Sequence, residues 1–248
     1  MSFEGFGKES FDFFQDLARN NNKPWFDANR SRYEAYVTGA FRSLLDDLEP
    51  FVLKLNARFE VNGKTNGNFS RINRDIRFSK DKSPYKPNFY LYFFDSRHHR
   101  SAAGRLYVGL SAECMTVGFS IYGAEKKSEK KALEAIFRER MKTDQRLFDR
   151  LLGAIVRKRK YETYWHRQEK GDWAQHPALP RKEEDWQTLQ AWVVRKVFMP
   201  GAPGLHSGKF ARRVETIFSD LYPIYIFTSV EDKDWHNQVK KSIAVIKS

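Results

Sequence analysis

The sequence predicts one α+β domain over residues 1–248, an antiparallel sheet packed with N-terminal and C-terminal helices. Apolar residues recur at helical spacing near both ends of the chain, whereas residues 105–121 alternate as strands do. No internal repeat, low-complexity linker or step in composition divides the chain, which favours one domain over two. A chain of 248 residues, 15% of them aromatic, is long enough to bury a sizeable core.

Two helices are expected in the N-terminal region. Ser10 is a candidate N-cap for the first, whose apolar residues lie within 11–18. Pro24 suits the first turn of a second helix, and the spacing over 26–48 makes that helix long and amphipathic. Pro50 is expected to kink or end it.

The middle of the chain is predicted to form the sheet. Residues 89–94 are apolar at every position, as in a central strand. Residues 105–111 and 114–121 alternate in polarity, and the short Ala112-Glu113 link predicts a hairpin between them. We therefore expect an antiparallel meander with helices on one face.

Helices are expected to return in the C-terminal half. Ser128 is a candidate cap, the apolar stripe over 147–156 indicates a clear helix, and the spacing of Trp186–Val193 predicts another. Residues 161–180 follow no regular pattern. Pro200–Gly204 is a loop, and two further helices are expected after it.

The charge of the chain favours negatively charged partners. Lys and Arg number 44 against 31 Asp and Glu, a formal net charge of +13. This surplus suits nucleic acid or phosphorylated small molecules, although charge by itself constrains only solubility and association.

Other features narrow the class of protein. Cys114, the one cysteine, excludes an internal disulfide and any multi-cysteine metal site, and we expect it to be a structural thiol. The histidines have no metal-binding spacing, so we expect no metal site, and no cofactor is evident. No apolar run approaches the ~20 residues of a membrane helix and no secretory signal is visible, so we expect a cytoplasmic protein without a membrane partner.

A dense cluster of cations occupies residues 71–88. Six basic residues cannot be neutralised by two acids, so a purely structural ion network, the plainer alternative, leaves a positive surplus. Because the planar fork of arginine binds phosphate or carboxylate bidentately, the cluster predicts an anion-binding site. Its predicted ligand-binding residues are Arg71, Arg74, Asp75, Arg77, Lys80, Asp81, Lys82, Tyr85 and Lys86.

Several functions remain open for this cluster. We expect Asp75 to orient the arginines around a phosphorylated small molecule or another anion, with Tyr85 adding a hydroxyl donor and a ring. One alternative is an enzyme acting on a phosphorylated or carboxylated small molecule, with Asp75 or Asp81 as candidate catalytic base. Another is a basic module that binds nucleic acid or an acidic protein.

A second, weaker anion site is predicted where a helix begins after the Gly/Pro loop. Basic residues replace the acids usually favoured at a helix start, and an anion bound at exposed amides would account for them. An ordinary capped helix is the alternative. The residues concerned are His206, Lys209, Arg212 and Arg213.

The cluster also carries a family resemblance. The run Arg71-x-x-Arg74-Asp75-x-Arg77-Phe78, followed by Asp81-Lys82-Ser83-Pro84-Tyr85, resembles the signature of a bacterial conserved hypothetical family, domain-of-unknown-function family 2461. The similarity extends to the opening Phe6…Phe11…Phe14-x-x-Leu17 and to residues 22–26 and 29–34. The resemblance implies a single α+β domain without an established activity. It supports the choice of the matching residues as site residues, but it does not assign their roles.

Overall fold

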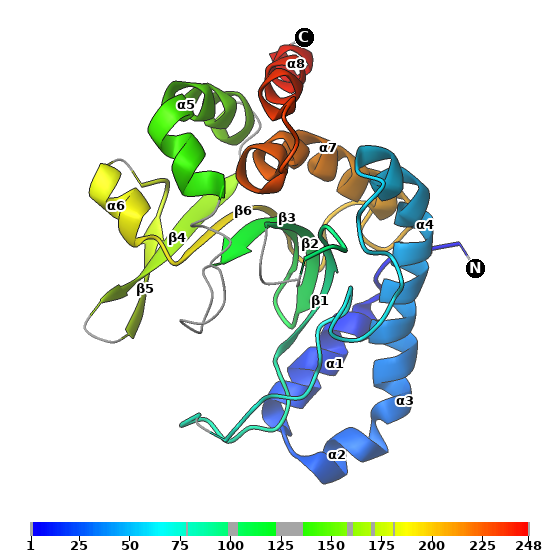
Figure 1. The fold of residues 1–248 in the computed structure, drawn as a ribbon. Helices are drawn as coiled ribbons and strands as arrows, with labels where there is room; N and C mark the ends of the chain where they lie inside the picture. Colours follow the sequence, from blue (N-terminus) through cyan, green and yellow to red (C-terminus); the bar gives the residue numbers. More distant parts are fainter. Residues whose placement is uncertain are drawn as a thin grey trace. The chain divides into compact units, whose positions relative to one another are not determined.

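The computed structural model describes residues 2–77, 79–98, 104–122, 136–157, 161–169, 172–180 and 182–247. Six strands form one antiparallel sheet in the order β1-β2-β3-β6-β4-β5, and helices lie before, between and after these strands in the sequence (Figure 1). The predicted α+β class is therefore confirmed.

The chain groups into two compact units, each with its own core. The first comprises Met1–Phe93, Tyr107–Val117 and Val197–Glu215, and the second comprises Phe94–Leu106, Gly118–Lys196 and Thr216–Ser248. A single domain over 1–248 stays a prediction.

The first unit opens with a helical region. Its elements are α1 (Lys8–Arg19), α2 (Lys23–Ala28), α3 (Arg30–Tyr33), the π-helical turn η1 (Glu34–Gly39) and α4 (Ala40–Leu55). As predicted, Pro24 lies in the first turn of α2, and the Asn22 side chain caps it by accepting from the Trp25 amide. The predicted cap Ser10 is wrong. Gly7 holds the N-cap of α1, and the Ser10 hydroxyl lies inside the helix and donates to the Tyr36 carbonyl at 2.7 Å.

The long helix predicted over 26–48 is interrupted. Asn29 separates α2 from α3, and η1 then widens the winding before α4 begins. Pro50 does not end the helix, since α4 continues to Leu55. The amphipathic pattern itself is confirmed, because the apolar side of α4 is buried. Its buried residues are Phe41, Leu44, Leu45, Leu48 and Val52.

The meander consists of β1 (Asn88–Phe93), β2 (Arg105–Ser111) and β3 (Met115–Tyr122), and the hairpin predicted between the last two is confirmed. The central position predicted for residues 89–94 is wrong, because β1 lies at the edge of the sheet. Its outer side is nevertheless covered. The Ser70 amide donates to the Tyr90 carbonyl at 2.9 Å, and the Tyr92 amide donates to the Asn68 carbonyl at 2.8 Å.

Two sequence expectations for the C-terminal half are corrected. Residues 161–180 contain an antiparallel hairpin in which Trp165 opposes His176. The helix predicted over Trp186–Val193 is a short helix followed by a strand. The elements after β3 are α5 (Arg138–Leu152), the π-helical η3 (Gly153–Arg157), β4 (Glu162–Glu169), β5 (Asp172–Pro177), α6 (Glu183–Thr188), β6 (Ala191–Phe198), α7 (Lys209–Ser229) and α8 (Trp235–Lys247). The expected cap Ser128 and the motif residue Phe78 lie outside the described residues.

An aromatic cluster forms the core of the second unit. Trp192 of β6 packs against Phe119 of β3 with ring centroids 5.7 Å apart, and Phe148 of α5 packs against Phe227 of α7 at 4.7 Å. Arg140 fixes the end of α7 by donating to the carbonyls of Ile226, Phe227 and Val230. These contacts bring α5 and the end of α7 onto one face of β3 and β6.

Candidate functional site

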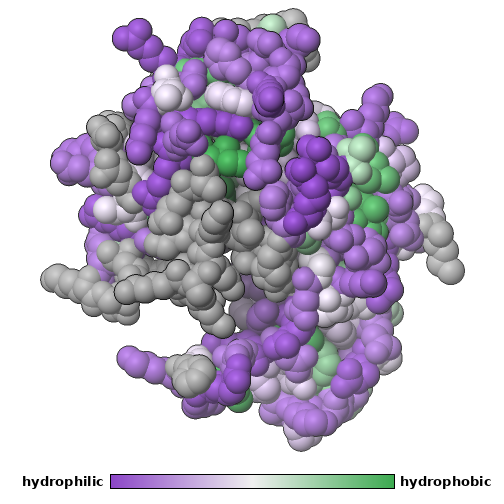
Figure 2. Space-filling model, viewed as in Figure 1, coloured by the Kyte–Doolittle hydropathy of each residue, from purple (hydrophilic) through white to green (hydrophobic). Residues whose placement is uncertain are grey.

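Residues 71–77 and 79–86 form an extended arm, in which two chain segments run antiparallel (Figure 1). The Arg74 amide donates to the Pro84 carbonyl at 2.8 Å, and the Lys86 amide donates to the Ile72 carbonyl at 2.8 Å. The predicted cluster is therefore a hairpin-like projection. Its exposed side chains present a hydrophilic surface (Figure 2).

The base of the arm is clamped onto the helical region by Tyr85. The Asn21 side chain donates to the Tyr85 carbonyl at 2.9 Å and accepts from the Tyr85 amide at 3.0 Å, as a neighbouring strand would. The Tyr85 ring is 5% exposed and stacks on Phe26 with centroids 4.1 Å apart. Tyr85 therefore packs in the core, where its ring is not available for stacking on a ligand.

Two arginines of the arm are bound by carboxylates of the arm. Arg77 donates to both carboxylate oxygens of Asp75, from Nε at 3.0 Å and Nη2 at 2.6 Å. Arg74 donates through Nη1 to Asp81 and through Nη2 to the Ser79 hydroxyl. The orienting role expected of Asp75 thus takes the form of a direct ion pair with Arg77.

The pairing changes the acidity of both carboxyl groups. Hydrogen bonds from Arg77 are the main cause that lowers the pKa of Asp75 to about 2. Hydrogen bonds from Ser83, followed by that from Arg74, lower the pKa of Asp81 to about 2. Carboxylates of such low basicity are poor proton acceptors near neutral pH. The candidate catalytic role of Asp75 and Asp81 stays a prediction.

The lysines of the arm have separate environments. Lys80 is exposed, Lys82 is exposed and donates to the Ile76 carbonyl at 2.9 Å, and Lys86 is half-buried. The three lysines therefore differ in how open they are to solvent.

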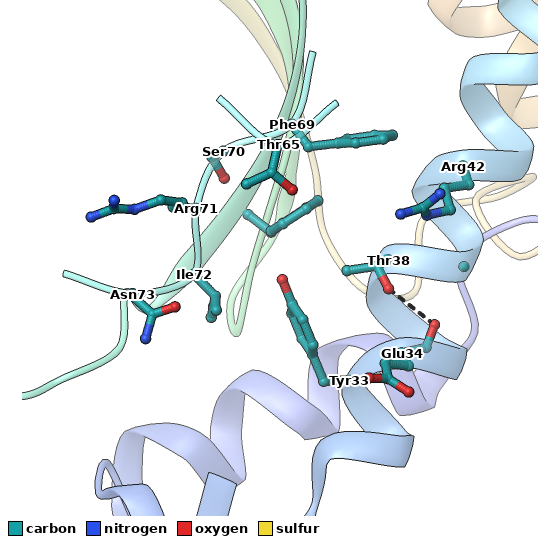
Figure 3. Close-up of a pocket in the computed structure, with 12 residues that line it drawn as sticks. Tyr33, Glu34, Thr38, Arg42, Thr65, Phe69, Ser70, Arg71, Ile72 and Asn73 are labelled. Atoms are coloured by element: carbon teal, nitrogen blue, oxygen red, sulfur yellow. Dashed lines mark hydrogen bonds between the residues drawn. The ribbon is translucent and has the colours of Figure 1, made fainter. Parts of the chain in front are cut away.

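A pocket of about 510 Å³ adjoins the start of the arm (Figure 3). One wall comes from α3, η1 and α4, and the other from residues 65–73, with Phe89 of β1 beside them. All of these residues belong to the first unit. The lining residues are Tyr33, Glu34, Thr38, Gly39, Arg42, Thr65, Phe69, Ser70, Arg71, Ile72, Asn73 and Phe89.

The helical wall presents polar groups four residues apart. Glu34, Thr38 and Arg42 line the pocket, and residues at this spacing lie on one side of a helix. Glu34 and Thr38 fall within η1, a kind of turn that recurs at functional sites. Arg42 was not among the predicted site residues. The four-residue repeat of polar side chains opposite the apolar stripe is the sequence signal that could have found it.

Two arginines line this pocket on opposite walls, and of these Arg42 points into it. The Arg42 guanidinium points across the pocket from α4, 6.0 Å from the centre of the Phe69 ring, and the Arg71 side chain extends outward from the opposite rim (Figure 3). Among the described residues, neither has a carboxylate within salt-bridge distance. Arg71 is thus the one predicted arginine that lines the pocket, and its partner there is Arg42.

The hydroxyl group of Tyr33 lies between the two walls of the pocket. The Tyr33 side chain is largely buried and its hydroxyl points into the pocket (Figure 3). Burial raises the pKa of this hydroxyl above its ordinary value, so the group is protonated at neutral pH and can donate a hydrogen bond. The pocket thus combines two cations, one carboxylate, hydroxyl groups and an apolar floor.

The second predicted anion site lies at the start of α7. His206 Nδ1 is 2.5 Å from the Phe6 carbonyl, and the Phe6 amide donates to the Leu205 carbonyl at 3.0 Å. A Cβ at Gly5 would lie 2.2 Å from the Ser207 amide nitrogen, so the N-terminal segment lies directly against this turn. Lys209, Arg212 and Arg213 follow on the first turns of the helix. This second site stays a prediction.

Two further kinds of feature are absent from the described residues. Within the described ranges, no group of three or more His, Cys, Asp or Glu side chains is placed to hold a metal ion. In the same part of the chain, no helix is both long and apolar enough to cross a membrane.

The fold and these sites define a basic α+β protein with a polar pocket beside an arginine-rich arm. The chain belongs to the family described as conserved hypothetical protein (DUF2461), whose model matches residues 9–227. This agrees with the resemblance seen in the sequence. No curated protein matches the chain.

Proposed function

We propose that the protein binds a small organic anion, one that bears a phosphate or carboxylate group, in the pocket between α4 and residues 65–73. Arg42 holds the anionic group from within the pocket, and Arg71 closes over it from the rim. The apolar part of the ligand packs against Phe69 and Phe89. A volume of about 510 Å³ falls within the roughly 300–1,000 Å³ that is usual for small-molecule sites.

The observation that carries this proposal is the pairing state of the arginines. Arg74 and Arg77 already have carboxylate partners, whereas Arg42 and Arg71 have none among the described residues. A charge-assisted hydrogen bond from guanidinium to phosphate or carboxylate is among the strong ones, and two such groups at one pocket favour an anionic ligand. Glu34 favours a ligand that also carries a hydroxyl group, since its carboxylate accepts hydrogen bonds.

Calorimetric titration of the full chain with phenyl phosphate and with benzoate tests this proposal. We expect at least one of these aromatic anions to bind and Arg42→Gln to weaken that binding about tenfold, because a charge-assisted hydrogen bond contributes ~1.5–3 kcal/mol. Arg32→Gln is the matched control. Arg32 is a half-buried arginine of α3 that is bound to Asp16 at 2.9 Å and does not line the pocket.

The control is expected to bind as the unaltered protein does. The proposal is wrong if neither anion binds at millimolar concentration. It is equally wrong if Arg42→Gln and Arg32→Gln bind the anion with the same affinity, because the effect would then follow net charge alone.

A further inference from the structure

The helical wall of the pocket carries two opposite charges. Glu34 of η1 and Arg42 of α4 both line the pocket, and they lie toward opposite ends of this wall with Thr38 between them (Figure 3). Arg42 follows Glu34 by eight positions in the sequence, which corresponds to about 12 Å along an α-helix that rises ~1.5 Å per residue. The wall therefore has a negative end and a positive end.

Neither charge of this wall is neutralised by a neighbour in the described part of the chain. Arg30 precedes Glu34 by one helical turn, a spacing that suits an ion pair, but its guanidinium donates to Asp27 at 2.8 Å. Among the described residues, no cation lies within salt-bridge distance of the exposed Glu34 carboxylate, and no carboxylate lies within that distance of Arg42. The protein thus leaves a carboxylate as well as a guanidinium available to a ligand.

The pocket is largely apolar on the side that faces these charges. Phe69, Ile72 and Phe89 line it there. On the helical wall, the Thr38 hydroxyl donates to the Glu34 carbonyl at 3.2 Å, so its hydrogen atom is already engaged and it adds no charge. The ligand that best fits these surroundings has an apolar middle and a polar group at each end.

The sign of the charge at each end of the wall selects the chemistry of these two groups. A guanidinium binds phosphate or carboxylate. A carboxylate accepts hydrogen bonds from hydroxyl and ammonium groups, and the bond from an ammonium group is the stronger because both partners are charged. A second anionic group at the Glu34 end would be repelled, which disfavours ligands that are anionic at both ends.

We propose that the ligand of this pocket is a zwitterion, an organic phosphate or carboxylate that carries an ammonium group at its other end. Arg42 binds the anionic group, and Glu34 accepts hydrogen bonds from the ammonium group. The inference rests on the proposed function, because it concerns the same pocket. It adds the class of ligand and makes Glu34 the residue that selects it.

Two series of probes of similar shape test the chemistry at the Glu34 end. Phenyl phosphate has no polar group opposite its phosphate, O-phosphotyramine has an ammonium group there, and para-hydroxyethylphenyl phosphate has a hydroxyl group. Benzoate, para-aminomethylbenzoate and para-hydroxymethylbenzoate form the same series with a carboxylate. Each probe is titrated calorimetrically at neutral pH into the full chain and into the variants Glu34→Gln and Glu9→Gln.

Glu9→Gln is the matched control. Glu9 is an exposed glutamate of α1 that does not line the pocket, so its replacement removes the same charge elsewhere in the first unit. Glu34→Asp is a second variant, which keeps the charge on a shorter stem. We expect it to retain part of the preference for ammonium, which separates the loss of the carboxylate from damage to the helix.

We expect the unaltered protein and Glu9→Gln to bind the ammonium probe about fivefold more tightly than the hydroxyl probe, the upper range for an ion pair open to solvent. Glu34→Gln should bind the two probes equally and keep its affinity for the parent anion. General attraction to a chain of formal net charge +13 predicts the reverse order, because the ammonium probe is the less negative of the two. A preference for ammonium therefore does not arise from net charge.

Three results overturn the inference while the proposed function stands, provided that the parent anion still binds and Arg42→Gln weakens it. The hydroxyl probe binds as tightly as the ammonium probe, or Glu34→Gln keeps the preference for ammonium, or Glu9→Gln loses that preference to the same extent as Glu34→Gln. If no probe of either series binds, the proposed function and the inference fail together.

Discussion

The arginines of the arm and the arginines of the pocket have different neighbours, although Arg71, Arg74 and Arg77 lie within one short stretch of sequence. The guanidiniums of the arm meet carboxylates two and seven residues away, and those of the pocket meet none in the described part of the chain. An arginine can bind an incoming anion only to the extent that its own protein leaves it unpaired. The density of arginines in a sequence is therefore a weaker guide to a ligand site than their pairing.

The largest effect is expected at the base of the arm. Tyr85→Ala removes a buried ring stacked on Phe26 and should lower the free energy of unfolding by about 3 kcal/mol, as for other large buried aromatic residues. Urea denaturation measures this loss. Tyr85→Phe keeps the ring and should leave binding of the pocket's anion unchanged. A marked loss of affinity in Tyr85→Phe would instead show that the Tyr85 hydroxyl takes part in binding the anion.

An intermediate effect should separate the two kinds of arginine directly. Arg71→Gln is expected to weaken binding of the anion that the pocket recognises several-fold, because one of two guanidiniums is lost. Arg74→Gln, three residues away, should change the affinity less than about twofold, since Arg74 is bound to Asp81. Calorimetry on both variants makes the comparison. Equal losses would show that the pairing within the arm does not persist in solution.

The smallest effect concerns pH. Asp75 and Asp81 have pKa values lowered to about 2, so their pairing contributes stability above about pH 4, and that contribution is lost as the pH falls through about 2. Both pairs are largely solvent-exposed, so this contribution is small and Asp75→Asn should lower the urea midpoint only slightly at neutral pH. Carboxyl carbon NMR should find both midpoints near 2. A midpoint near 4 at Asp75 would mean that Arg77 is free of it.

Much of the fold follows from local pattern alone. The apolar stripes of α1 and α4 and the alternation of β2 and β3 were recognisable, because each buries one side against a core. The start of β6 was wrongly predicted as part of a helix. A short apolar run with Trp192 and Val193 fits a buried strand as well as a helix. The hairpin of β4 and β5 was missed, because its alternation is largely between polar residues.

The position of β1 and the makeup of the pocket depend on contacts between distant segments. Residues 68–70 cover the outer side of β1, so an edge strand has the composition of a central one. Arg71 was predicted from the density of cations. Arg42 was not, because the polar repeat to which it belongs does not reveal that residues 65–73 fold against α4. The pairing of Arg74 with Asp81 likewise depends on the chain folding back on itself in the arm.

The wide turn at Glu34–Gly39 has a geometric consequence for α4. Each residue of a helix advances the direction of its side chain by about 100°. Where the winding loosens to accommodate an added residue, everything beyond it rotates by that angle relative to everything before it. Phe41 and Leu44 can therefore meet the core while Arg42 still points across the pocket. Removal of one residue from this turn would swing the guanidinium out of reach without altering a single charge.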